Sequence, residues 1–181
     1  DDRRPCENIE IRNCIHWSDL SRILMVGPES HADRIGDIHM HNCEILWLGP
    51  PVNKTGFGDW DGCAPAFCFE AAEDSLMEDI LIENTRVHLY QDRHEKDLIK
   101  IEPCLTRFAK RDTMGRLQNV TFKNLDCLGP WQPRICIWGK DEEHDVKNVH
   151  FENVRIDGQP VDASYTQLSI GEYTNHITFS P

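Results

Sequence analysis

Two glutamates occupy the same position in two similar segments, and a lysine lies two residues before the second glutamate. The segments are Ala66-Phe-Cys-Phe-Glu-Ala71 and Leu98-Ile-Lys-Ile-Glu-Pro103, which contain Glu70, Lys100 and Glu102. Glycoside hydrolysis uses two carboxyl groups, about 5–5.5 Å apart for retention and about 6.5–9.5 Å apart for inversion. Lys100 can neutralise only one carboxylate, so we expect the other to have a raised pKa. Glu70 and Glu102 are therefore the candidate catalytic acid and base, and the alternative is a surface salt-bridge ladder.

Further side chains near this pair could bind a substrate. Trp138 occupies the position of Glu102 in the next similar segment, where its indole could stack on a sugar ring. Trp60 lies in an insertion from Leu48 to Ala64 that would form one wall of a cleft, unless the tryptophans only cover the core beneath the loops. The candidate substrate-binding residues are Arg22, Glu29, Lys100, Trp138 and Trp60.

The sequence predicts neither a metal site nor a cofactor. The eight cysteines show no paired Cys-x-x-Cys spacing, so a zinc site is not expected. Cys14 and Cys43 each follow an asparagine that ends a repeated motif. They are predicted to be small apolar core residues stacked on one another, with disulfides as the alternative.

A six-residue motif recurs along the chain and would position these side chains. Its pattern is Asn or Asp, apolar, any, apolar, any, Asn, and its starts are 29, 42, 40, 29 and 28 residues apart. The alternation has the period of a strand, and recurrence at this spacing is typical of solenoids. The closing Asn can stack along the axis and bond to turn backbone through its amide. The copies are Asn8–Asn13, Asp37–Asn42, Asp79–Asn84, Asn119–Asn124, Asn148–Asn153 and a frayed one from His176.

A second strand motif alternates with the first, and a short third strand follows the closing Asn. Three short strands per repeat without a helical period predict an all-β fold, a right-handed parallel β-helix of about five to six coils. Residues 1–181 would form this single domain. Alternation turns Glu70, Lys100 and Glu102 outward, on rungs about 4.8 Å apart.

Composition narrows the choice of partners. The chain has 31 acidic and 19 basic residues and a formal net charge of −12, which argues against nucleic acid and anionic membranes. No apolar run approaches the roughly 18 residues of a membrane span. Asp1 stands close before the first strand motif, with no capping helix between them. We therefore expect either the C-terminal part of a longer β-helix or a homo-oligomer that covers the uncapped end.

Three segments follow one another in the order Asn8-Ile-Glu-Ile-Arg-Asn-Cys14, Ser21 to Glu29 and Asp37 to Ile45. This order of segments resembles that of the pectin-lyase-like β-helices. Within these it is similar to family-28 glycoside hydrolases, the polygalacturonase relatives. Arg22 falls where that family has a histidine. Lys100 matches the first of the two basic residues in the family's Arg-Ile-Lys element.

The resemblance implies a protein of polysaccharide metabolism, extracellular or periplasmic, with its cleft on the sheet of the second strand motif. Two functions remain open. One is a glycoside hydrolase, or a fragment of one, that acts on a polysaccharide or oligosaccharide. The other is a non-catalytic carbohydrate-binding or structural β-helix.

Overall fold

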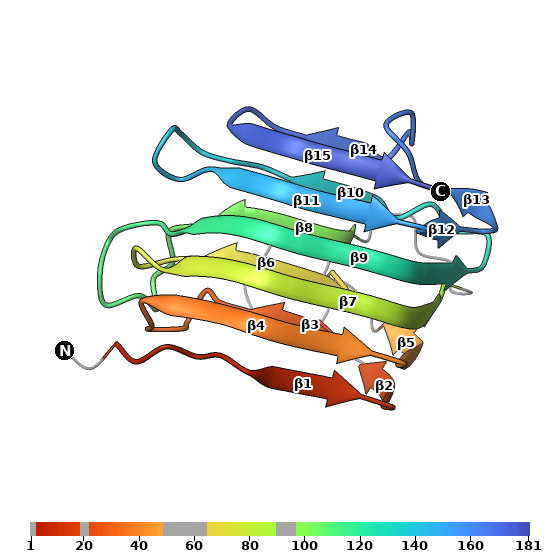
Figure 1. Ribbon diagram of the computed structural model, residues 1–181, viewed down its shortest axis with the longest axis horizontal. Helices are drawn as coiled ribbons and strands as arrows, with labels where there is room; N and C mark the ends of the chain where they lie inside the picture. Colours follow the sequence, from red (N-terminus) through yellow and green to blue (C-terminus); the bar gives the residue numbers. More distant parts are fainter. Residues whose placement is uncertain (1–2, 19–21, 49–64, 90–96) are drawn as a thin grey trace.

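The computed structural model describes residues 3–18, 22–48, 65–89 and 97–181. These residues form an all-β structure built from parallel sheets, as the sequence predicts (Figure 1). Within these ranges no helix could cross a membrane.

The first motif forms the large sheet, in the order β1-β4-β7-β9-β11-β15. All six strands are parallel and in register, so that Ile9, Ile38 and Ile80 are successive partners. The register confirms the predicted strand repeat. The strands are β1 (Ile9–Arg12), β4 (Arg34–His41), β7 (Leu76–His88), β9 (Arg116–Leu128), β11 (Val146–Glu152) and β15 (Thr174–Ser180).

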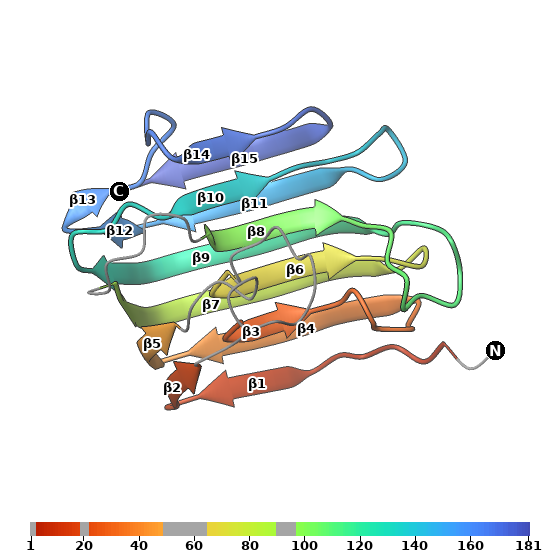
Figure 2. The same ribbon diagram turned by 180° about the vertical axis from the view of Figure 1, so that it is seen from behind.

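The second motif forms a separate five-stranded parallel sheet, in the order β14-β10-β8-β6-β3 (Figure 2). Its strands pair so that Cys68, Lys100 and Cys136 are consecutive partners. This confirms the predicted second strand. The strands are β3 (Leu24–Val26), β6 (Phe67–Ala71), β8 (Asp97–Pro103), β10 (Arg134–Ile137) and β14 (Leu168–Ile170).

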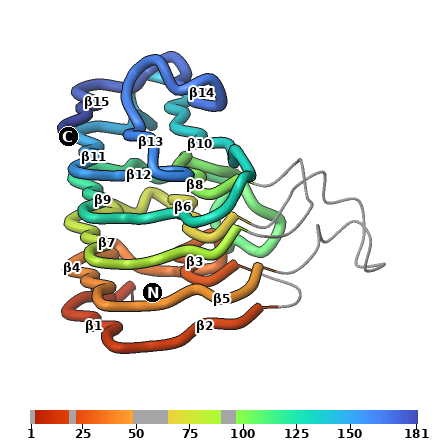
Figure 3. Tube along the Cα trace, turned by 90° about the vertical axis from the view of Figure 1, so that its right-hand side faces the viewer, coloured from red at the N-terminus to blue at the C-terminus, as the bar shows by residue number. Residues whose placement is uncertain are grey.

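Short strands continue the large sheet beyond the closing asparagines, where the third strand is expected. β2 (Ile15–Ser18) pairs with β5 (Glu44–Leu48), and β5 pairs with the end of β7. β12 (Arg155–Ile156) pairs with β9 and also forms an antiparallel pair with β13 (Gln159–Pro160). Seen from the side, equivalent segments of successive repeats lie above one another (Figure 3).

The core lies between the two sheets. Phe67 and Phe69 of β6 point toward β9, where Phe122 is fully buried. Phe122 stacks on Phe151 with ring centroids 5.4 Å apart, and Phe151 stacks on Phe179 at 5.1 Å. Apolar residues at every second position of both motifs therefore meet in one continuous core.

Asparagine and aspartate form the corners of the large sheet because they tolerate left-handed backbone better than other residues with a side chain. Asn84 has a φ of 48° and Asn124 a φ of 50°. The Asn124 amide donates to Asn84 Oδ1 at 2.9 Å, and the Asn153 amide donates to Asn124 Oδ1 at 2.8 Å. The predicted stacking of closing asparagines is thus confirmed.

Candidate functional site

The structure brings Glu70, Lys100 and Glu102 together on the five-stranded sheet. Glu70 of β6 and Glu102 of β8 are directly paired residues. Lys100 Nζ lies 2.7 Å from Glu70 Oε1 and 2.6 Å from Glu102 Oε1. One ammonium therefore bridges both carboxylates, although its single positive charge can balance only one of them.

The two carboxylates are buried although they alternate away from the core, and the Lys100 side chain between them is 25% exposed. Glu70 is 7% exposed and Glu102 is 8% exposed. The salt bridges of the alternative, a charged ladder, are present, but the two carboxylates of the ladder are largely withdrawn from water. Buried charges need partners of opposite charge and hydrogen bonds, and this cluster supplies both.

Lys140 is a fourth member of the cluster, which the sequence motifs did not predict. It follows β10 in an irregular segment, and its Nζ lies 2.8 Å from Glu102 Oε2. Burial raises the pKa of Glu102, but Lys100 and Lys140 outweigh burial, so its pKa is lowered overall. At neutral pH Glu102 is a carboxylate and is not the proton-holding partner of the pair.

Arg22 and Glu29 lie before and after β3, the edge strand of this sheet. Arg22 hydrogen-bonds to Cys68, a buried thiol whose pKa is raised to about 12, chiefly by burial. Between Arg22 and Glu29, Gly27 has a φ of +73°, and a Cβ there would lie 1.8 Å from the Glu70 carbonyl oxygen. Glycine is thus required at this close approach. Glu29 itself is exposed in the following turn.

Trp138 does not face the carboxylates. Its Nε1 donates to Ser169 Oγ at 2.9 Å, and a Cβ on Gly171 would lie 2.9 Å from its Cδ1. The indole therefore leans over β14, on the far side of β10 from Glu102. Trp60 and most of the predicted Leu48 to Ala64 wall lie outside the described residues.

A second surface, which the sequence analysis did not single out, lies on the short strands β2 and β5. Trp17 and Trp47 stack with ring centroids 5.2 Å apart and planes 11° apart. Trp17 is 62% exposed and Ile15 is 74% exposed. The signal in the sequence was the alternation of Ile15, His16 and Trp17, which turns two large apolar side chains outward.

A groove of about 830 Å³ adjoins these side chains. Asparagine residues from four repeats line it, together with polar groups of the short strands. Arg86 Nη1 lies 3.5 Å from Glu44 Oε1, so the groove carries paired charge beside apolar surface. The lining includes Asn13, Asn42, Asn84, Asn124, Glu44 and Arg86.

Comparison with known proteins gave no match. Neither a family model, nor a curated protein, nor a solved structure is similar enough to this chain to be reported. The functional interpretation therefore depends on the geometry and on the sequence motifs.

Proposed function

We propose that the chain is a right-handed parallel β-helix that binds a polysaccharide. The β-helix is supported by the pairing of equivalent strands in successive repeats, with β2 and β5 as a third, shorter set. The right hand follows from the strong preference of parallel crossovers for that sense. The homo-oligomer and the extracellular or periplasmic location remain predictions.

The proposed binding surface is the tryptophan face, defined as Ile15, Trp17, Leu46 and Trp47 with the adjoining groove. The stacked Trp17–Trp47 pair, in which Trp17 is 62% exposed, is the observation that carries the proposal. Indoles offer a flat apolar surface for the C–H face of a sugar ring, while amides and paired charges beside them can bond to hydroxyl groups. The net charge of −12 favours a neutral polysaccharide over a polyanionic one.

Replacing Trp17 by alanine should weaken polysaccharide binding about tenfold or more, the usual effect of removing an aromatic anchor. Isothermal titration against soluble β-glucan, xylan, galactomannan and polygalacturonate would measure this. Phe108→Ala is the matched control, because Phe108 is 47% exposed outside the tryptophan face. Equal binding by Trp17→Ala and the parent, or no binding to any of the four polymers, would contradict the proposal.

Glycoside hydrolysis is the second candidate function, and the pairing of Glu70 with Glu102 on adjacent strands favours it. Because the pKa of Glu102 is lowered, Glu102 would act as the base or nucleophile, which leaves the acid role to Glu70. Arg22 and Lys100 would then contact the substrate from the same sheet.

If the chain hydrolyses a polysaccharide, Glu70→Gln and Glu102→Gln should each reduce turnover about a hundredfold or more. Release of reducing ends from the same four polymers measures the rate, and circular dichroism checks that the variants fold. Glu143→Gln, on an exposed residue after β10, is the control. Parental rates in both cluster variants would show that the two carboxylates have a structural role only.

A further inference from the structure

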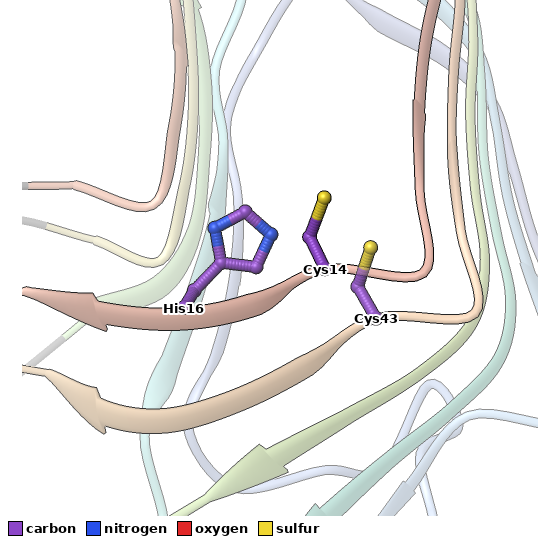
Figure 4. A group of neighbouring side chains, drawn as sticks. All are labelled: Cys14, His16 and Cys43. Atoms are coloured by element: carbon purple, nitrogen blue, oxygen red, sulfur yellow. The ribbon is translucent and has the colours of Figure 1, made fainter.

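Three potential metal ligands converge between the first two repeats. Cys14, His16 and Cys43 project to the same side of the backbone, from β2 and from the turns that precede β2 and β5 (Figure 4). One ligand atom of each, two sulfurs and a ring nitrogen, lies within 4.8 Å of the other two.

Strand register explains why these residues meet although they are not close in a sequence motif. The amide of Glu44 donates to the Cys14 carbonyl at 2.9 Å, which places Cys14 directly beside Cys43 of the next repeat. His16 is two residues after Cys14, so an extended chain turns both side chains to the same side. Ile15 and Trp17 are exposed, which leaves His16 on the inner side of the strand.

The later repeats show that packing alone does not require these residue types. The partners of His16 in successive repeats are apolar and almost fully buried: Ile45, Val87, Cys127 and Ile156. Cys14 and Cys43 occupy equivalent positions in the first two repeats. In the later repeats the equivalent residues are Thr85, Leu125 and Val154. Only the first of these repeats places an imidazole in this column, and it does so beside the two thiols.

One nitrogen of the imidazole also lacks a hydrogen-bonding partner. His16 Nε2 is buried and has no hydrogen bond within the part of the chain that the structure describes. A buried polar atom without a partner is unfavourable, and a bound metal ion is one interaction that would compensate for it. A metal ion between the three side chains would supply the missing interaction.

We propose that Cys14, His16 and Cys43 bind a zinc ion through two thiolate sulfurs and one ring nitrogen. Zn²⁺ accepts this combination of ligands in tetrahedral sites, where thiolate sulfurs stand about 3.8 Å apart. Small side-chain rotations would bring the three atoms from their present separations to that spacing. The two thiol protons pass to solvent, the charges of Zn²⁺ and two thiolates cancel, and a water molecule takes the fourth position.

The Cys-x-x-Cys criterion of the sequence analysis could not reveal this site, because its two thiols come from different repeats. Cys14 and Cys43 are 29 residues apart, which is the spacing of the repeat itself. The proposal does not rest on polysaccharide binding, although Cys14 and Cys43 also line the groove beside Ile15 and Leu46.

Metal titration of the whole chain tests the proposal. The chain, kept reduced and stripped of metal, should bind one Zn²⁺, and its Tm should rise by about 5–10 °C at zinc concentrations well above the Kd. Co²⁺ in place of Zn²⁺ should give a thiolate-to-metal charge-transfer band and the visible bands of a tetrahedral ion. The band is a direct spectroscopic sign of sulfur ligation, separate from any effect on stability.

Two variants borrow residues from later repeats and should therefore fold without metal. His16→Val copies Val87, and Cys43→Thr copies Thr85, each from the same column as the residue it replaces. Both should lose the zinc-dependent rise in Tm and the charge-transfer band. Cys6→Ser, which removes an exposed thiol outside the cluster, should retain both.

Several results would overturn the zinc site. One is the absence of both the Tm rise and the cobalt band in the reduced parent chain. Another is undiminished binding by His16→Val and Cys43→Thr, which would place the metal elsewhere. A third is a Cys14–Cys43 disulfide in chain purified without reductant, combined with no zinc binding after reduction, which would assign the two thiols to a structural cross-link.

Discussion

Replacing Phe122 by alanine should lower the free energy of unfolding by about 3–5 kcal/mol. Phe122 is fully buried between the two sheets, with its ring centroid 5.7 Å from that of Phe67 and 5.4 Å from that of Phe151. Alanine would leave a cavity that rigid strands on both sides cannot close, and it would break the continuous row of rings. Because neighbouring repeats depend on each other, the loss should affect the repeats on either side.

Urea unfolding followed by circular dichroism measures this loss. Phe108→Ala removes the same side chain from a position that is 47% exposed, and it should change the free energy of unfolding by less than about 0.5 kcal/mol. A Phe122→Ala chain with less than about 1 kcal/mol of destabilisation would mean that the core is not packed as the structure has it.

The strands could be predicted because each motif carries its own evidence. Period-two alternation fixes which residues turn inward, and a closing Asn or Asp marks each corner, as Asn84 and Asn124 illustrate. Because each repeat carries the same motif, equivalent motif positions are expected to pair even where the loops between copies differ in length, so Glu70 and Glu102 could be placed side by side from the sequence. All of these inferences use local patterns that recur along the chain.

The surroundings of the predicted site could not be derived in the same way. Burial of Glu70 and Glu102 and the reach of Lys140 depend on irregular segments, for which the repeat gives no rule. Trp138 follows the predicted column, but its side chain turns toward Ser169, a choice of rotamer that alternation does not determine. The pairing of Cys14 with His16 could not be predicted for a different reason. His16 is the one polar residue in a column that is otherwise apolar, and the repeat pattern does not predict such an exception.

Replacing Lys100 by methionine should destabilise the chain by about 3–5 kcal/mol at neutral pH. Methionine fills a similar volume but leaves Glu70 with no ammonium at 2.7 Å and Glu102 with Lys140 alone. Removing one partner leaves an uncompensated buried charge. The resulting loss of stability is much larger than the net stabilisation that the intact ion pair supplied. The lysine is thus expected to be essential to this sheet whether or not the chain is an enzyme.

The pH dependence distinguishes lost charge pairing from lost packing. The folded-state pKa of Glu102 is lowered, so its contribution to stability is present above its unfolded pKa and disappears as the pH falls through the folded value. In Lys100→Met this contribution is weakened. The difference in unfolding free energy between parent and variant should therefore shrink as the pH falls into the acidic range, where the carboxyl groups become protonated.

Denaturant unfolding at a series of pH values tests this expectation. Adding Glu70→Gln to Lys100→Met should recover part of the stability, because the unpaired charge is then removed as well. Lys123→Met is the matched control: Lys123 pairs with Glu152 at 3.0 Å on the open surface, and its loss should leave stability almost unchanged. A Lys100→Met defect that is equal at all pH values and is not relieved by Glu70→Gln would show that Lys100 acts through the packing of its methylene chain.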